Sequence, residues 1–310
     1  MTKGDESMSK IDFTGRVAIV TGAGAGLGRN CAMELAKRGA KVVVNDLGGA
    51  RDGTGGGAAA ADLVVKEIKD AGGEAVPNYD SVADVAGGEN IVKTAIDAFG
   101  KVDILVNNAG ILRDKTFLKM EPENWDAVIA VHLRGAYCVT RPAFANMREN
   151  GYGRIIMTSS SSGVFGNFGQ TNYGAAKMGL AGLANVLKLE GAKYNIKVNV
   201  LLPGAGTRMT EDVIPPEAFE RMKVEYVTPA TLYLCSEQCQ DSGFYINAGG
   251  GNFSRSNIMT GLGVKFEEIP TPEDIQKHWS AITSLENAKY FPSTAEWSIV
   301  NQKAPVVKKS

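Results

Sequence analysis

Short apolar runs rich in β-branched residues alternate along the chain with longer stretches of helical periodicity. The runs lack polar alternation, which is typical of parallel strands that are buried on both faces of a sheet. They cover residues 16–20, 41–46, 102–110, 153–160, 196–204 and 243–250. The amphipathic stretches 28–40 and 61–73 end in the glycines expected just beyond a helix. The pattern predicts an α/β fold, a Rossmann-type doubly wound parallel sheet in a single domain.

Two segments fall outside this alternation. Residues 47–60 form a Gly- and Ala-rich insertion after the second predicted strand, and residues 252–310 follow the last one. We expect a flexible N-terminus over 1–12, a Rossmann domain over 13–251, and a C-terminal helical extension that packs on the domain or on a dimer interface. Thr271, followed by proline and two acids, predicts a helix start. We expect that helix to pass through Gln276, Trp279 and Ile282.

Composition narrows the class of protein. The 33 basic and 34 acidic residues nearly cancel, which argues against a nucleic-acid partner. No apolar run approaches the length of a membrane span, and neither a secretory signal nor an SKL-type C-terminus is present, so we expect a cytoplasmic protein without a membrane partner. The 4 scattered cysteines predict reduced thiols rather than disulfides, and no metal site is expected.

A glycine-rich loop joins the first predicted strand to the first helix. It contains Gly22, Gly26, Leu27 and Gly28, with a strand before it and a helix after it, as a dinucleotide site requires. Glycines there let backbone N–H groups and the helix N-terminus approach a pyrophosphate. A plain turn is the alternative, which the context disfavours.

Acidic and small residues at the following strand ends predict the cofactor. Asp46 stands where a carboxylate binds the adenosine ribose and repels a 2′-phosphate, which favours NAD. Asp46 could instead only start a turn, and Arg51 nearby weakens the argument. Asp80 either faces the adenine or caps a helix. Small residues that permit close packing beside the cofactor end the next strand: Asn108, Ala109 and Gly110.

A tyrosine and a lysine supply the candidate chemistry. Tyr173 and Lys177 stand four apart in a helical pattern, so both side chains share one helix face. A free phenol has a pKa of about 10, and a neighbouring ammonium lowers it by stabilising the phenolate. We therefore expect Tyr173 to transfer a proton in a hydride-transfer reaction. One hydroxyl of the serine-rich strand end 159–162 is expected to bind the substrate oxygen, and the others to form a turn.

These motifs together resemble the short-chain dehydrogenase/reductase family over residues 13–251. The matching residues are Thr21 to Gly28, Asn107 to Gly110, Ser160, Tyr173 to Lys177 and Pro203-Gly204. The resemblance implies that Ser160, thirteen residues before the tyrosine, is the catalytic serine, and that Lys177 holds the nicotinamide ribose. It further implies that Pro203, Gly204 and Thr207 lie near the nicotinamide carboxamide.

Longer stretches are similar to one subgroup, the (3R)-hydroxyacyl-CoA dehydrogenase unit of peroxisomal multifunctional enzyme type 2. They include VVVNDLGG, VHLRGAY, GRIIMTSSSSGVFGNFGQTNYGAAKMGL and TPEDIQKHW. This resemblance implies NAD-dependent oxidation of a (3R)-3-hydroxyacyl-CoA to the 3-ketoacyl-CoA, as in β-oxidation, by a homo-oligomer, either a dimer or a tetramer. Cations that would bind the phosphates of an acyl-CoA are Arg113, Lys115, Lys119 and Arg208.

Two departures leave alternatives open. His132 stands where the family has an asparagine that carries a relay water, so it either relays a proton through water or simply packs. The Pro203-Gly204 pair is often missing in the subgroup, so this loop does not identify the substrate. One alternative is a dehydrogenase of hydroxysteroids, cyclic alcohols or steroid side-chain CoA esters. Another is a non-catalytic NAD-binding subunit of an assembly, which the complete set of catalytic residues disfavours.

Overall fold

The computed structural model describes residues 10–205, 222–301 and 304–307, with only the backbone given for 299–301. Contacts divide the chain into two compact units, Met1–Arg255 and Ser256–Ser310.

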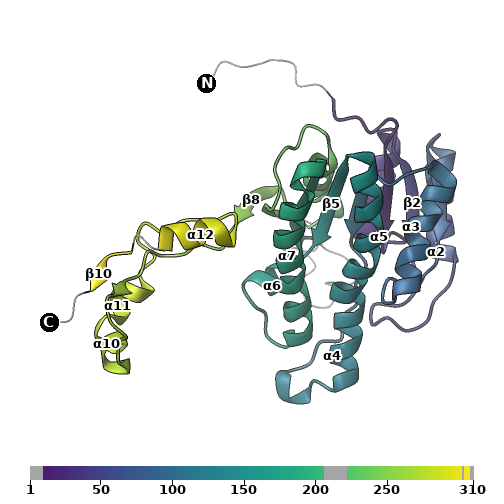
Figure 1. Cartoon of the computed structure of the whole chain (residues 1–310). Helices are drawn as coiled ribbons and strands as arrows, with labels where there is room; N and C mark the ends of the chain where they lie inside the picture. The colour runs from purple at the N-terminus through teal and green to yellow at the C-terminus, as the bar shows by residue number, and fades with distance from the viewer. Residues whose placement is uncertain (1–9, 206–221, 302–303, 308–310) are drawn as a thin grey trace. The chain divides into compact units, whose positions relative to one another are not determined.

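The first unit is built on one sheet of eight strands in the order β3-β2-β1-β4-β5-β6-β7-β8 (Figure 1). Strands β1 to β7 are parallel, as the sequence predicted. The strands are β1 (Val17–Thr21), β2 (Lys41–Asn45), β3 (Glu74–Asn78), β4 (Ile104–Asn107), β5 (Gly153–Thr158), β6 (Ile196–Gly204), β7 (Tyr245–Gly249) and β8 (Asn252–Ser256). Because the order reverses between β1 and β4, the carboxyl ends of these two strands leave a crevice between the loops that follow them.

The eighth strand was not expected, because the sequence pattern placed the last strand at residues 243–250. Gly250 and Gly251, both with positive φ, form a two-residue turn that folds β8 back beside β7. Such a turn makes β8 antiparallel to its neighbour. The residues of β8 are mostly exposed, so the strand carries no apolar run that the hydrophobic pattern could detect.

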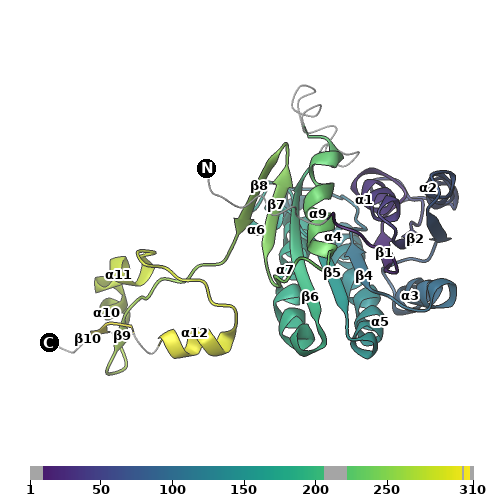
Figure 2. The same cartoon turned by 90° about the horizontal axis from the view of Figure 1, so that it is seen from above.

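Helices cover both faces of the sheet (Figure 2). One apolar cluster joins the sheet to α1, α2 and α9, and a second joins the opposite face to α3, α5 and α7. The helices are α1 (Gly26–Lys37), α2 (Ala59–Asp70), α3 (Val85–Phe99), α4 (Pro122–Ile129), a π-helical turn (Ala130–Arg134), α5 (Gly135–Asn150), α6 (Ser161–Val164), α7 (Thr171–Gly191) and α9 (Thr228–Cys235). Short 3₁₀ turns lie at Phe117–Lys119, Ala192–Tyr194 and Val224–Tyr226.

The second unit contains short elements only: α10 (Pro272–Lys277), α11 (Trp279–Thr283), α12 (Thr294–Asn301), and the paired strands β9 (Lys265–Phe266) and β10 (Val306–Val307). Thr271 begins α10 with a capping box that it shares with Asp274, as its sequence context predicted. The prediction of one helix through Trp279 and Ile282 was wrong, because the backbone leaves the helical conformation at His278. How this extension packs on the domain or on a partner stays a prediction.

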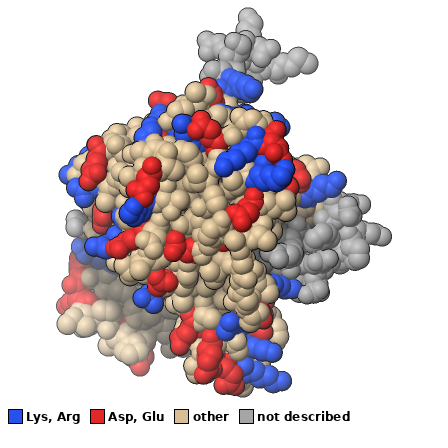
Figure 3. Space-filling view, turned by 90° about the vertical axis from the view of Figure 1, so that its right-hand side faces the viewer, with Lys and Arg blue, Asp and Glu red and all other residues tan. Residues whose placement is uncertain are grey.

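The surface carries charges of both signs, with Lys and Arg interspersed among Asp and Glu over the face shown in Figure 3. None of the helices that the structure describes is both long and apolar enough to cross a membrane.

The packing of α1 on the sheet can be tested at Leu35, which is completely buried among β-strand and helix side chains. Leu35→Ala leaves a cavity and should reduce the free energy of unfolding by about 2–5 kcal/mol, measured by urea denaturation. Leu63→Ala on α2, where the leucine is 56% exposed, is the matched control and should change the free energy by less than about 1 kcal/mol. Equal losses in the two variants would contradict the assigned core.

Candidate active site

A pocket of about 800 Å³ opens at the carboxyl ends of the parallel strands, where the strand order reverses. Its walls combine residues of the predicted cofactor motifs with residues of the predicted chemical motifs. From the cofactor motifs it takes Gly22, Gly26, Leu27, Asp46, Asp80, Asn108, Ala109, Gly110, Pro203 and Gly204. From the chemical motifs it takes His132, Ser160, Tyr173 and Lys177. The structure therefore brings together residues that the sequence had assigned separately.

The glycine loop is shaped by close backbone contacts. A Cβ on Gly22 would lie 2.7 Å from Ala109 Cα, and a Cβ on Gly28 would lie 2.3 Å from the Gly22 oxygen. Gly28 therefore packs beneath the loop and is not part of the pocket wall. Helix α1 begins directly after the loop with no side-chain cap and no acid in its first turn, so its first N–H groups face the pocket end. This cradle fits a pyrophosphate, which is the part of a dinucleotide that such N–H groups bind.

Asp46 lies just beyond β2, with both carboxylate oxygens bound by backbone amides. Gly24 N–H donates to Oδ2 and Gly48 N–H donates to Oδ1, each at 2.7 Å. The turn expected as the alternative is thus present, and the carboxylate also lines the pocket. Asp46 can hold the turn and also bind a ligand, because a carboxylate has about four acceptor positions and two are used here.

Asp80 follows β3 and lines the same end of the pocket. It does not cap a helix, since the side chain that caps α3 belongs to Asp84. Instead its carboxylate accepts a hydrogen bond of 2.7 Å from Asn78 Nδ2. Asn45 Nδ2 donates to the Asp80 carbonyl and to Asn78 Oδ1, which joins the ends of β2 and β3.

The end of β4 is tied to the glycine loop by the Asn108 amide. Its Nδ2 donates to the carbonyls of Thr21 and Gly22, each at 3.0 Å. The Thr21 hydroxyl in turn accepts from the backbone N–H groups of Asn108 and Ala109. These bonds hold β1 and β4 at a fixed separation where the crevice forms.

Tyr173 and Lys177 project from α7 toward the end of β5. Lys177 Nζ donates to the Thr158 carbonyl at 2.6 Å and lies 5.3 Å from the centre of the Tyr173 ring. Ser159 Oγ donates to the Lys177 carbonyl at 2.7 Å, so strand and helix are joined twice. Ser160 begins α6, with its Oγ accepting from Ser162 N–H. Ser160 and Tyr173 both line the pocket, and their side chains are hydrogen-bonded. The expectation that the other three serines only form a turn does not hold for Ser159, whose hydroxyl binds α7.

Burial shifts the pKa values of Tyr173 and Lys177. It raises the pKa of Tyr173 to about 12, although a hydrogen bond with Ser160 acts in the opposite direction. It also lowers the pKa of Lys177 to about 7. Loss of hydration thus dominates the pKa of the phenol in the protein without dinucleotide. That Lys177 and the positive nicotinamide ring together lower this pKa in the complex stays a prediction.

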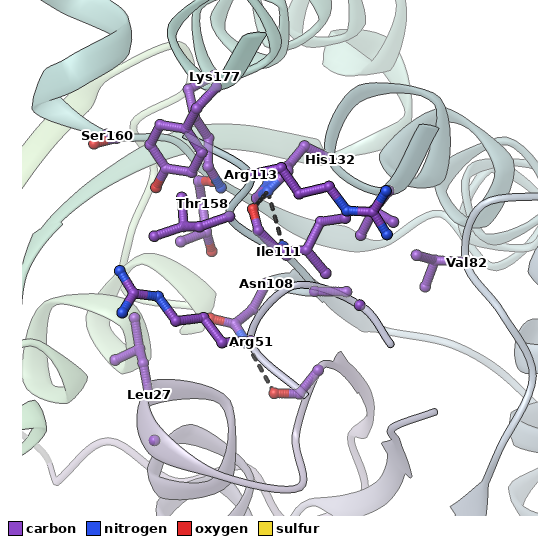
Figure 4. A pocket seen from close by; sticks show the side chains of 18 of the residues that line it. Leu27, Arg51, Val82, Asn108, Ile111, Arg113, His132, Thr158, Ser160 and Lys177 are labelled. Carbon is purple, nitrogen blue, oxygen red and sulfur yellow. Dashed lines mark hydrogen bonds between the residues drawn. The ribbon is translucent and has the colours of Figure 1, made fainter. Parts of the chain in front are cut away.

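His132 lies in the π-helical turn between α4 and α5 and is 2% exposed. Its Nε2 lies 2.8 Å from the Ile111 oxygen and 3.0 Å from the Ile111 nitrogen (Figure 4). Its ring meets Tyr173 edge-on at 5.2 Å. Burial, together with the charge of Lys177, holds the pKa of His132 well below its usual range, so the imidazole is neutral. A Cβ on Gly110 would lie 2.3 Å from His132 Cε1, which explains the glycine at that position.

A second, very small cavity of about 10 Å³ lies behind His132, close to the volume that one water molecule needs. His132, Thr158 and Lys177 are among its lining residues. Within the described residues, His132 Nδ1 and Thr158 Oγ1 are buried and have no hydrogen-bond partner. Two unsatisfied polar atoms beside one small cavity point to a water site.

The candidate cations for an acyl-CoA are not all at the pocket. Arg113 lines it, whereas Lys115 and Lys119 are exposed and are not part of its wall. Arg208 and Thr207 lie outside the described residues. In the described part of the chain, no group of three or more His, Cys, Asp or Glu side chains is arranged to hold a metal ion.

Asn172, which no sequence pattern singled out, is completely buried and directly precedes Tyr173 in the chain. Its Nδ2 donates to the carbonyls of Arg113 and Asn124, and its Oδ1 accepts from Tyr173 N–H. Asn172 thus joins the start of α7 to the loop after β4 and to α4. The sequence carries no periodic signal for such a residue, because its partners are backbone atoms far away in the chain.

A parallel sheet whose reversal point carries a glycine loop and a buried tyrosine–lysine pair is the arrangement of an oxidoreductase that uses a nicotinamide dinucleotide and acts on CH–OH groups. The family is shown by comparison with known proteins. The model of the short chain dehydrogenase family matches residues 16–218, and the chain belongs to this family.

Three relatives show where the similarity extends. A short-chain type dehydrogenase/reductase of Mycobacterium tuberculosis is 57% identical over 274 residues, covering 88% of this chain and 96% of that one. Peroxisomal multifunctional enzyme type 2 of Drosophila melanogaster is 49% identical over 296 residues, covering 94% of this chain and 49% of that one. The hydroxyacyl-CoA dehydrogenase ChsB1 of M. tuberculosis is 43% identical over 214 residues, 65% of each chain. This chain thus spans about half the length of the multifunctional enzyme.

Solved structures with a similar fold include two dehydrogenase-related proteins. The full-length Drosophila multifunctional enzyme has a TM-score of 0.79 at 42% identity, covering 95% of this chain and 51% of that one. A 7α-hydroxysteroid dehydrogenase complexed with NADH and 7-oxo glycochenodeoxycholic acid has a TM-score of 0.70 at 30% identity, covering 78% of this chain and 95% of that one.

The protonation of Tyr173 can be measured directly. Because burial raises the pKa of the phenol to about 12, Tyr173 should stay neutral in the free protein through pH 10. The ultraviolet difference spectrum between wild type and Tyr173→Phe, titrated without dinucleotide, should show no phenolate from this residue below that pH. A difference signal that titrates near pH 7 would contradict the assigned effect of burial.

Proposed function

We propose that this chain oxidises a (3R)-3-hydroxyacyl-CoA to the 3-ketoacyl-CoA with NAD. The observation that supports this most is the continuous pocket that joins the glycine loop and Asp46 to Ser160, Tyr173 and Lys177. The similarity to a hydroxyacyl-CoA dehydrogenase and to multifunctional enzymes supports the thioester substrate. Arg113 at the pocket wall supplies one cation for a phosphate of coenzyme A.

Ser160, Tyr173 and Lys177 each have a separate function in the proposed reaction. The Ser160 hydroxyl and the Tyr173 phenol hold the substrate oxygen, and Tyr173 exchanges a proton with it. When bound, the dinucleotide accepts the hydride from the carbon that bears this oxygen. In the direction of reduction, the raised pKa of Tyr173 keeps the phenol protonated and able to donate. In the direction of oxidation, Lys177 must stabilise the phenolate, helped by the positive charge of the oxidised nicotinamide ring.

His132 connects this site to the small cavity. We infer that a water there accepts from or donates to His132 Nδ1 and Thr158 Oγ1, which are otherwise unsatisfied. Lys177 lines the same cavity, so a proton lost from Tyr173 has a path through the ammonium and this water. The neutral imidazole suits this function, because it keeps one nitrogen able to accept.

The proposal also covers the compartment, the oligomeric state and the C-terminal extension. We place the protein in the cytoplasm as a homodimer or homotetramer, with the extension 252–310 packed on the domain or on the dimer interface. A hydroxysteroid substrate is the second candidate, because a structural relative of 30% identity is a 7α-hydroxysteroid dehydrogenase.

A substrate panel separates the two candidates. NAD reduction should be measured with (3R)- and (3S)-3-hydroxyacyl-CoAs of increasing chain length, with a free hydroxysteroid and with a simple secondary alcohol. The proposed function predicts turnover of the (3R) thioesters above all others. Turnover of the free steroid without turnover of any thioester would overturn it, and NAD binding without any turnover would favour a non-catalytic subunit.

Tyr173→Phe removes the proton donor and leaves the ring. We expect kcat to fall by at least about 10³-fold, within the range attributed to general acid–base catalysis, while the Kd for NAD from calorimetry stays within about twofold. Tyr137→Phe, an exposed phenol on α5 outside the pocket wall, is the control and should retain wild-type kcat. Loss of NAD binding in Tyr173→Phe would mean that the residue has another function.

Asp46→Ala tests the cofactor preference. Removing the carboxylate removes repulsion of a 2′-phosphate, so the ratio of kcat/KM for NAD over NADP should fall by roughly tenfold or more, as for the loss of one charge-assisted contact. The variant also loses the bonds from Gly24 and Gly48, so its melting temperature must be measured alongside. An unchanged ratio in a folded variant would place discrimination of the cofactor at another residue.

A further inference from the structure

The Gly-rich insertion after β2 reaches the loop that follows β4 and contributes to the pocket wall. We call residues 47–57 the strap. Its base lies at the end of β2, and its tip contacts the loop that follows β4. Arg51 O accepts from Leu112 N–H at 3.0 Å, and Asp52 O accepts from Arg113 Nε at 2.8 Å. Because β1 lies between β2 and β4 in the sheet, the strap passes over the end of β1, where the glycine loop begins.

Internal bonds give the strap a defined shape. Gly57 N–H donates to Leu47 O and closes its base, while Ala50 N–H donates to Thr54 O around the tip. A Cβ on Gly48, where φ is +75°, would lie 2.0 Å from the Gly57 oxygen. A Cβ on Gly53, where φ is +83°, would lie 3.1 Å from an Ile111 methyl group. Glycines therefore allow the strap to close on itself and on the loop after β4.

The strap forms part of the wall of the pocket. Gly49, Ala50, Arg51 and Gly53 line the same pocket as Gly22, Gly26 and Leu27. A dinucleotide that reaches from Asp46 to Tyr173 therefore passes both the strap and the glycine loop. In Figure 4 the Arg51 side chain extends from the strap toward the side of the pocket where Leu27 lies.

Arg51 is one of the few cationic side chains in a pocket that also contains several carboxylates. Among the described lining residues the acids are Asp46, Asp80 and Asp114, and the cations are Arg51, Arg113 and Lys177. The glycine loop offers N–H groups to a diphosphate but no charged side chain, while Asp46 and Asp80 add negative charge at the adenosine end. The Arg51 guanidinium on the strap offsets that charge, and its fork of N–H groups suits the geometry of phosphate oxygens.

We propose that the strap clamps the dinucleotide, with Arg51 binding the diphosphate and with the bonds to Leu112 and Arg113 holding the clamp closed. The proposal rests on the dinucleotide site proposed above and adds a binding residue and a barrier to cofactor release. It gives a physical reason for the insertion: the loop lets a pocket rich in carboxylates hold a doubly negative group.

Calorimetry of the full-length protein tests the contact. Arg51→Gln should raise the Kd for NAD, NADP and ADP-ribose by the same factor of roughly tenfold, since all three carry the diphosphate, and Arg51→Lys should recover part of the loss. Lys69→Gln, an exposed cation on α2, is the charge-matched control and should leave every Kd unchanged. Unchanged affinity in Arg51→Gln, or a loss confined to NADP, would overturn the proposal, the latter because Arg51 would then bind the 2′-phosphate.

Stopped-flow fluorescence tests the clamp. Arg113→Leu removes one bond that holds the strap closed and should raise the dissociation rate of NADH between about two- and tenfold, the range of one hydrogen bond. An unchanged dissociation rate would overturn the clamp. If wild type bound no dinucleotide at all, the proposed function itself would fail. If wild type bound and these variants behaved like it, only the strap would be wrong.

Discussion

The contact between the end of β5 and the middle of α7 sets the geometry of the site. The Lys177 ammonium donates to the Thr158 carbonyl, and the Lys177 carbonyl accepts from the Ser159 hydroxyl. Two consecutive strand residues thus hold one helix residue from both ends. Tyr173 lies one turn earlier on the same helix face, so this attachment also determines where its phenol meets Ser160. Burying a lysine here destabilises its charge, which is why its pKa is lowered to about 7.

Hydrogen bonds between side chains and backbone atoms also position the other parts of the pocket. Asn108 ties β4 to the glycine loop, and Asn172 ties α7 to the loop after β4. His132 is bound to Ile111 from a widened turn of helix, with Gly110 making room for its ring. Each attachment joins elements that are far apart in the chain, so the pocket depends on the completed sheet. The rigid frame holds both ends of a dinucleotide site at a constant separation.

Local patterns predicted the parallel strands, the glycine loop and the tyrosine–lysine pair, because each leaves a periodic or spaced signature. The strand Asn252–Ser256 left none, since its exposed edge needs no apolar face. The sign of the Tyr173 pKa shift was also out of reach, because spacing places the ammonium beside the phenol but does not reveal how little water reaches either. Asn172 was missed, and the insertion 47–60 was noted without its contacts, for a related reason: the partners of both include backbone atoms far away in the chain. The sequence motifs identified the candidate residues, whereas their burial in the folded protein determines the direction of their pKa shifts.

The central claim is that the pocket moves a hydride from the hydroxyl-bearing carbon to a nicotinamide while Tyr173 takes the proton. Incubating the protein with NAD and a (3R)-3-hydroxyacyl-CoA deuterated at carbon 3 tests it in one step, with the dinucleotide analysed by mass spectrometry. The account predicts that the deuterium appears in the reduced dinucleotide. Deuterium found in the solvent, or retained in the thioester while the dinucleotide stays oxidised, would contradict it.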